Sequence, residues 1–546
     1  MDEHEGSSVE ETTLNNILNK LDTTPRLILL GFLFTSMPIL FRLIFTGSIL
    51  SAIWPHAVNT LEWTMWARGH VKFMPLFFFI LACAVYVLRQ PKVVNVRWVQ
   101  RALDIFAGSL LCMLTLYFLL DVFYLRGAFL LLPTTYAALF LTVLTGRFGS
   151  PRLRTLGQSK IAPSRLLHII AVFSCSWLLL PGLPASFGFA PSPPEAPEIG
   201  YGAQPGPFSV DVIQFPYELP AEVEEIRGET ESAIDFSIYL YLPNLKDVYL
   251  SEIPLAILLH GFLYPDQDAY TDWIHHLAAK GIAVAFIQYP SDIWPKGVDE
   301  FSPTEKAGMS DFMQHTYRNL SIRAALDTLD REILGEGLPE TVQSILGKVS
   351  ISTDEVWIGG HSLGASYSFF VVNYAMEKGW GQSALMINLE SPAPRPSQPN
   401  LQPTWSSLPN NTIIHSVVTQ DDMSVGSCAG AFMHDYFAED VGNNSVFIEV
   451  PSDKYGFPRM VASHYLQTNP AHDALADWAF YRRIDAQADW LTAETRNDTI
   501  TIDWARNYLL DEAMLAPMGQ WSDGTPVLAL NLFFGEDVRI KEYQDC

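Results

Sequence analysis

Residues 356–367 read VWIGGHSLGASY, and this stretch decides the fold of the second half of the chain. The apolar residues at its start have the composition of a buried β-strand, and those after the serine are compatible with a helix. Between them lies the pentapeptide GHSLG (360–364), a G-x-S-x-G pattern. Small residues two positions before and after Ser362 let the backbone turn sharply without a clash. The stretch therefore predicts a strand, a tight turn that presents Ser362, and a helix.

A serine hydroxyl is a weak nucleophile unless a histidine removes its proton and a carboxylate orients that histidine. The strand-like segment SVFIEV (445–450) leads to His464, which we expect to be the base. Other histidines fit less well, because His415 lies inside a strand-like run, His434 in a helical one, and His472 at the start of the last long helix.

The acid is expected between the serine and the base in chain order. The strand-like segment TIIHSVVT (412–419) runs directly into Asp421 and Asp422, and we prefer Asp422. Asp421 and Glu390, which ends the strand-like ALMINLE, are the alternatives. The sequence thus predicts a triad of Ser362, Asp422 and His464.

The same chemistry needs backbone N–H groups that bind the oxyanion formed when the serine attacks. Leu363, directly after the serine, provides one. The strand-like LLHGF (258–262) ends in His-Gly, which makes the amide of Phe262 the expected second donor, with Leu263 next. His260 is then expected to hold this loop in place.

Strands alternate with helical periods throughout the second half, which predicts an α/β fold with a mostly parallel sheet covered by helices on both faces. The segment 291–315 is expected to contribute a cap, with Trp273 and Trp294 near the pocket. The sequence contains no H-E-x-x-H, C-x-x-C or phosphate-loop pattern, so we expect no metal site.

These motifs resemble those of the α/β-hydrolase superfamily across residues 208–546. LLHGF, GHSLG, the Asp422 turn and SHY (463–465) carry the resemblance, and 452–465 and 519–527 resemble dienelactone-hydrolase-like proteins. The acid turn TQDDMSV departs from the family pattern G-x-x-D-x-x-V at its first position, Thr419. The resemblance implies a serine hydrolase that cleaves a carboxylic ester without a metal or organic cofactor.

The first half of the chain is different, because it contains apolar segments about long enough to cross a bilayer. The acidic N-terminus, residues 1–26, lacks the features of a cleavable signal peptide. A transmembrane region of about five helices is expected over 27–187, in five segments: 27–46, 73–89, 102–125, 127–146 and 165–187.

Loop charges orient this region. Residues 89–101 contain four Lys or Arg and residues 147–165 contain five, whereas the alternate loops carry only Arg68 and Lys72, and Arg126. The positive-inside rule then places the N-terminus in the cytoplasm and everything beyond the fifth span outside it. We therefore expect an integral, multi-pass membrane protein whose second domain is extracellular, periplasmic or lumenal.

Residues 188–207 belong to a proline-rich stretch that predicts a semi-rigid linker to the α/β domain at 208–546. Residues 1–200 carry 15 Lys and Arg against 11 Asp and Glu, whereas the remainder carries 19 against 48. So acidic a domain repels phosphate backbones, which excludes nucleic acid as a partner. Four N-x-S/T sequons fall in this half, at Asn319, Asn410, Asn443 and Asn497.

Of the five cysteines, only Cys428 and Cys546 lie where they can pair outside a membrane, and they are either paired or free. The leading hypothesis is a membrane-anchored esterase acting on a small-molecule or lipid ester through an acyl-enzyme. One alternative is an acyltransferase that uses the same triad. The other is a membrane transporter or sensor with a non-catalytic hydrolase-like domain. The oligomeric state stays open.

Overall fold

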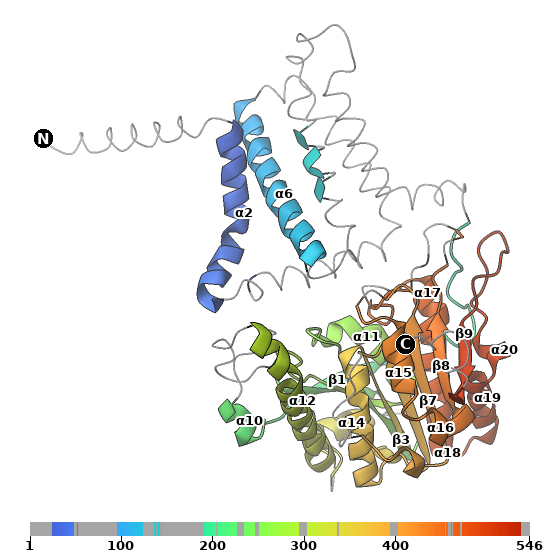
Figure 1. Ribbon diagram of the computed structural model, residues 1–546. Coiled ribbons are helices and arrows are strands. Elements are labelled where there is room, and N and C mark those ends of the chain that lie inside the picture. Colours follow the sequence, from blue (N-terminus) through green and yellow to red (C-terminus); the bar gives the residue numbers. More distant parts are fainter. Residues whose placement is uncertain are drawn as a thin grey trace, which may run out of the picture. The chain divides into compact units, whose positions relative to one another are not determined.

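The computed structural model of the chain describes residues 24–47, 96–123 and most of 191–536, together with Cys546 and a few residues near 52 and 136–144 (Figure 1). The longest gaps within the second half are 227–233, 294–302, 394–401 and 537–545. The chain divides into two compact units, Met1–Ala190 and Pro191–Cys546, and each is described by itself.

Two long helices are described in the first unit, α2 (Thr24–Thr46) and α6 (Arg97–Phe123), and they pack against each other. Glycines allow their backbones to approach closely, because a Cβ at Gly31 would overlap the Ile105 carbonyl and one at Gly108 the Ile28 carbonyl. Close contact through small residues is typical of helices that associate in lipid. By length and composition, both helices are sufficient to cross a membrane.

These two helices coincide with two of the five spans expected from the sequence, 27–46 and 102–125. The expected spans 73–89 and 165–187 lie outside the described residues, as does most of 127–146.

The second unit is an α/β domain, as expected, built on one nine-stranded sheet of order β1-β2-β4-β3-β5-β6-β7-β8-β9. From β4 to β8 all neighbours are parallel, and the antiparallel pairs β1–β2, β2–β4 and β8–β9 lie toward the edges. The strands are β1 (Val210–Pro216), β2 (Ser237–Pro243), β3 (Glu252–Leu259), β4 (Ala283–Ile287), β5 (Ser350–His361), β6 (Ala384–Glu390), β7 (Thr412–Thr419), β8 (Ser445–Val450) and β9 (Asn531–Phe534).

The described helices lie between and after these strands. They are α10 (Ala221–Ile226), η3 (Gln267–Tyr270), α11 (Thr271–Ala278), α12 (Pro303–Thr328), η5 (Leu329–Ile333), α13 (Glu340–Leu346), α14 (Leu363–Lys378), η7 (Trp405–Ser407), α15 (Ser427–His434), α16 (Ala438–Val441), η8 (Gly442–Asn444), α17 (Ala474–Ala476), η10 (Asp477–Tyr481), α18 (Arg482–Arg496), α19 (Thr499–Leu510) and α20 (Glu512–Leu515).

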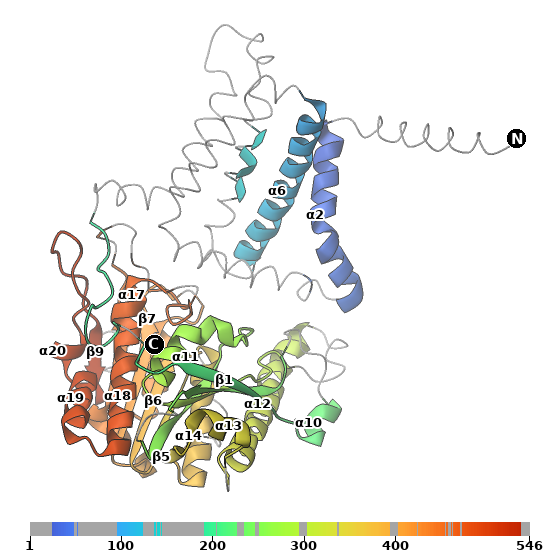
Figure 2. The ribbon, with the colours of Figure 1, turned by 180° about the vertical axis from the view of Figure 1, so that it is seen from behind.

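Helices cover both faces of the sheet (Figures 1 and 2). Alternate residues of a strand point to opposite faces, and β5 follows this rule. Val356 and Ile358 belong to the core that includes α14, whereas the indole N–H of Trp357 donates to Gln487 of α18 at 2.8 Å. The central strands are buried on both faces, which explains their continuous apolar runs.

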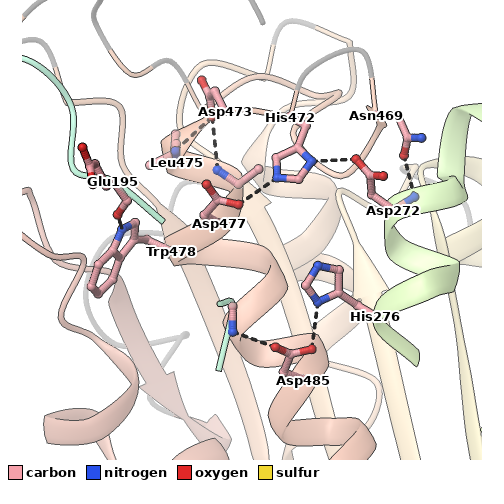
Figure 3. Close-up of polar contacts among 12 residues, drawn as sticks. Glu195, Asp272, His276, Asn469, His472, Asp473, Leu475, Asp477, Trp478 and Asp485 are labelled. Carbon is pink, nitrogen blue, oxygen red and sulfur yellow. Dashed lines mark hydrogen bonds and ion pairs between the residues drawn. The ribbon is translucent and has the colours of Figure 1, made fainter. Parts of the chain in front are cut away.

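The segment expected to form a linker includes residues that bond to the second unit from Pro191 onward. The Ser192 amide donates to the Ser522 hydroxyl, and the indole N–H of Trp478 donates to the Glu195 carbonyl (Figure 3). Further along, the Gly202 amide donates to the buried Asp485 carboxylate at 2.6 Å. Cys428 of α15 forms a disulfide with Cys546.

Candidate active site

The GHSLG turn lies at the carboxyl end of β5, where β5 ends at His361 and α14 begins at Leu363. Between them, Ser362 has φ 56° and ψ −118°, a conformation that L-residues rarely adopt. The Ser362 amide donates to the Glu390 carbonyl at the end of β6, and its carbonyl accepts from the Ala393 amide. The neighbouring chain therefore holds the strained turn on both sides.

Two glycines make this turn sterically accessible. A Cβ at Gly360 would lie 2.6 Å from the Gly364 carbonyl carbon and 2.7 Å from the Leu259 carbonyl oxygen. A Cβ at Gly364 would overlap the same Leu259 oxygen. The first turn of α14 thus packs directly on the end of β3, with no room for any side chain at either position.

His464 and Asp422 form a buried pair close to this turn. The Nδ1 atom of His464 lies 2.7 Å from Asp422 Oδ2, and both side chains are buried. The other carboxylate oxygen, Oδ1, accepts from the amides of Ser424 and Val425. Burial alone would raise the pKa of Asp422, but the hydrogen bonds from His464 and these amides hold the pKa below its ordinary value. Asp422 is therefore ionised at neutral pH, and its hydrogen bond keeps a proton on Nδ1 of His464.

The alternative acids are placed elsewhere. Glu390 is fully buried, and its two oxygens accept from Arg483 of α18 at 2.7 Å and from Gln467 at 3.0 Å. The loop between β8 and α17 carries His464, the predicted base, and is called the base loop below. The Asp421 amide donates to the Ala462 carbonyl of this loop, while Asp422 bonds to the His464 ring.

In the loop after β3, alternate backbone amides donate hydrogen bonds to side chains of the domain. The Gly261 amide donates to the Tyr270 hydroxyl at 3.0 Å, and the Leu263 amide donates to the Ser291 hydroxyl at 2.8 Å. The Phe262 amide lies between them, and it has no acceptor among the described residues, nor has the Leu363 amide at the start of α14. A Cβ at Gly261 would lie 3.4 Å from Ser362 Cβ, so this loop borders the serine. Leu263 is therefore excluded as an oxyanion donor, and Phe262 and Leu363 stay candidates.

His260 holds this loop, as the sequence led us to expect. Its ring nitrogens lie 2.8 Å from the Gly261 carbonyl oxygen and 2.9 Å from that of Tyr289, and its ring stacks on the Tyr289 ring. Burial lowers the pKa of His260 to about 4, so the ring is neutral at pH 7.

Sequence reasoning did not identify the role of His361. Its Nε2 lies 2.7 Å from the His464 carbonyl oxygen, and its Nδ1 lies 3.1 Å from the Tyr270 hydroxyl. Burial and the neighbouring His464 lower the pKa of His361 to about 3, which makes it a neutral link between three loops. Neither Tyr270 nor Gln467 carries a sequence signal that would have linked it to the site.

Trp273, which we expected near the pocket, is part of the core. Its side chain is fully buried, with its ring 5.8 Å from Trp357 and 4.8 Å from Phe480. It therefore packs α11 onto the sheet instead of lining a pocket. Trp294 and most of the side chains expected to form the cap lie outside the described residues.

A second acid–histidine cluster lies beyond the base loop (Figure 3). The ring nitrogens of His472 lie 2.6 Å from Asp272 and 2.7 Å from Asp477. Burial alone would lower the pKa of His472, but these two carboxylates raise it to about 9. An imidazolium that donates from both nitrogens has no lone pair to accept a proton. His472 therefore links α11 to η10 as a cation and is not suited to act as a base.

Comparisons with known proteins give matches to solved structures alone. An esterase from Pseudomonas putida matches with 13% sequence identity and a TM-score of 0.31, covering 53% of this chain and 85% of that chain. A structure from an analysis of two fungal esterases from Rhizomucor miehei matches with 15% sequence identity and a TM-score of 0.30, covering 54% of this chain and 87% of that chain. No family model and no curated protein matches the chain.

The crowding at Gly364 gives a first prediction. Gly364→Ala should lower the unfolding free energy by roughly 3 kcal/mol or more, because its methyl group has no space beside the Leu259 carbonyl. Gly379→Ala is the control, because Gly379 faces open space; unlike Gly364 it has a positive φ (72°), so only a backbone cost of about 1–2 kcal/mol applies there. Urea unfolding followed by tryptophan fluorescence measures both; equal losses would show that the turn tolerates a side chain.

Buried neutral histidines predict acid sensitivity. The pKa values of His260, His361 and His415 lie at about 4, 3 and 3, whereas the ordinary value is 6.5. Below pH 6.5 the unfolded chain thus binds more protons, so this stability is complete above pH 6.5 and falls as the pH is lowered, by roughly 1.4 kcal/mol per unit for each histidine. Asp473 acts in the opposite direction. Burial raises its pKa to about 6, so below pH 6 the folded chain holds a proton that the unfolded chain lacks, which offsets the loss of stability from one histidine.

This prediction is checked by urea unfolding between pH 7 and pH 5. The variant His415→Gln should flatten the slope by one histidine's share, because His415 donates to the Leu509 carbonyl as a buried neutral ring. A stability that does not change over this range would contradict the assignment of neutral histidines.

Proposed function

We propose that this chain is a membrane-anchored serine hydrolase that cleaves a carboxylic ester through an acyl-enzyme. Ser362 is the nucleophile, His464 the general base and then acid, and Asp422 the residue that orients His464. The observation that carries the proposal is the buried 2.7 Å pair of His464 and Asp422 beside a serine in a strained strand-to-helix turn. This combination is what serine acyl transfer requires.

The proposed reaction follows from the tautomer of His464. Because Asp422 accepts a hydrogen bond from Nδ1–H, Nε2 carries the lone pair that removes the Ser362 proton as Oγ attacks the ester carbonyl. The amides of Phe262 and Leu363 are proposed to bind the oxyanion. Nε2–H then protonates the leaving alcohol, and water, activated by the same nitrogen, releases the acid. All three triad residues are at most 9% exposed, which strengthens each of these electrostatic interactions.

Membrane anchoring is the second part of the proposal. It is supported by α2 and α6, two apolar helices of sufficient length with a glycine-mediated contact. We propose that the N-terminus is cytoplasmic and the α/β domain extracytoplasmic, as the loop charges predict. An enzyme fixed at a membrane has access to lipid esters as well as to soluble ones.

Labelling with a fluorophosphonate probe tests the catalytic assignment in the membrane-embedded full chain. Ser362→Ala should abolish labelling, and His464→Ala should slow it by roughly 10³-fold or more, because the hydroxyl then has no base. Asp422→Asn should slow it by roughly 10²–10⁴-fold through the wrong His464 tautomer.

Asp421→Asn is the matched control, a change of the same kind one residue away, and should leave the labelling rate within about twofold. A folded native protein that does not react with the probe would overturn the proposed activity. If Asp421→Asn slows labelling and Asp422→Asn does not, the acid is wrongly assigned.

A further inference from the structure

The four sequons of the second half are not equivalent in the folded domain. Asn410, Asn443 and Asn497 are exposed, whereas Asn319 is 3% exposed inside α12. The exposed three lie at the ends of elements: Asn410 and Asn443 each stand two residues before a strand, β7 or β8, and Asn497 is the C-cap of α18. A glycan needs an asparagine whose amide reaches solvent, and three of the four satisfy this.

The three exposed asparagines lie at the same edge of the sheet, the one formed by the amino ends of its parallel strands. The strands β7 and β8 are parallel, so Asn410 and Asn443 precede neighbouring amino ends. The α18 helix runs back toward that edge, since Arg483 near its start bonds to Glu390 at the carboxyl end of β6, and Glu494 near its end accepts from Asn411.

Further bonds hold this edge together. Arg506 of α19 donates to Asn411 at 2.7 Å and to Asn444 at 3.1 Å, the residues directly after Asn410 and Asn443. The proposed site is at the opposite edge, because Ser362 and Asp422 follow the carboxyl ends of β5 and β7. The eight residues of β7 separate the two edges by about 26 Å. Glycans here would leave the site open.

The disulfide is an independent observation about the environment. Cys428 and Cys546 are joined, and such bonds persist in oxidising compartments, where N-glycosylation also takes place. We infer that Asn410, Asn443 and Asn497 carry N-linked glycans at the edge of the sheet opposite the proposed site, and that Asn319 does not.

Expression of the full chain in a eukaryotic cell, followed by treatment with an N-glycosidase, tests this inference. The enzyme should increase electrophoretic mobility, and Asn410→Gln and Asn443→Gln should each remove one glycan. At Asn497, where φ is 55°, the sequon is better removed by Thr499→Ala, with Thr499→Ser as the control that preserves it. Asn319→Gln should leave the glycan number unchanged.

A folded chain with no N-glycan, or one whose glycan number falls in Asn319→Gln, would overturn the inference. Mass spectrometry of the glycosidase-treated protein, in which a released asparagine becomes aspartate, assigns each position directly. Neither readout depends on enzymatic activity, so a failure here is separate from a failure of the proposed hydrolase.

The hydrogen bonds of His361 carry a second inference, which rests on the proposed function. The His464 carbonyl only accepts, so His361 Nε2 must carry the proton, and Nδ1 must accept. The Tyr270 hydroxyl therefore donates to Nδ1, and its oxygen is left to accept from the Gly261 amide. Every donor in this series of hydrogen bonds has one acceptor, so the direction of each bond is determined.

This series of hydrogen bonds joins the three parts that must be positioned for acyl transfer. Gly261 precedes the proposed oxyanion donor Phe262, His361 precedes the nucleophile, and His464 is the base. We propose that Tyr270 and His361 are positioning residues that set the geometry of oxyanion donor, nucleophile and base. Small errors in such geometry are costly, since a 1 Å displacement can lower a rate by about 10²-fold.

Substitutions of His361 separate positioning from simple packing. His361→Gln keeps an N–H near the Nε2 position, whereas His361→Leu fills the space without a donor. Fluorophosphonate acylation should fall roughly 10-fold or more in His361→Leu, and His361→Gln should retain several times more activity than His361→Leu. Tyr270→Phe should also slow acylation. Melting temperatures are measured for all three variants.

If the acylation rates follow the melting temperatures alone, or if the Leu and Gln variants react equally, His361 is a packing residue and the positioning role is overturned. If the native chain does not react at all, the proposed function itself fails. The two failures are therefore distinguishable in one experiment.

Discussion

The conformation of Ser362 is the constraint on which the site depends. A non-glycine residue at φ 56° and ψ −118° is maintained only where its surroundings leave no alternative. Here the Glu390 carbonyl of β6 accepts a hydrogen bond from the Ser362 amide. The first turn of α14 lies so close to β3 that Gly360 and Gly364 have no room for a Cβ. The packing of one helix on two strands thus offsets the local strain, and the site is inseparable from the core.

A buried ionic network supports the base loop from beneath. Arg483 of α18 pairs with Glu390 at 2.7 Å, and Gln467, three residues after His464, donates to the other oxygen of Glu390. Removing one partner of such a pair leaves an uncompensated buried charge, which is far more costly than the pair itself is stabilising. The ends of β6 and α18 and the base loop are therefore held in one arrangement.

Much of the second unit follows from sequence patterns, because its strands are continuous apolar runs and its serine lies in a distinctive pentapeptide. The sequence favoured Asp422 over its neighbour Asp421, but the choice depends on the direction of each side chain after β7, which the spacing does not determine. Two other features were beyond prediction for physical reasons. Tyr270 and His361 meet across 91 residues of chain, and only the folded sheet brings them together. The proline-rich composition likewise gave no sign that residues from Pro191 onward bond to the domain.

The histidines of this domain illustrate how environment, and not residue type, decides chemistry. His361 faces a carbonyl and a hydroxyl, so burial keeps it neutral and it acts as a fixed dipolar link. His472 lies between two carboxylates, so it holds its proton to about pH 9 and acts as a cation. His464 and His276 each have one nitrogen bonded to a single carboxylate, that of Asp422 and of Asp485, an arrangement that orients an imidazole while leaving its other nitrogen able to take and return a proton. Of the two, it is His464 that borders the serine turn, because its carbonyl accepts from His361. The acceptors around each ring, together with the place of the ring beside the serine turn, thus separate the residue suited to catalysis from those suited to structure.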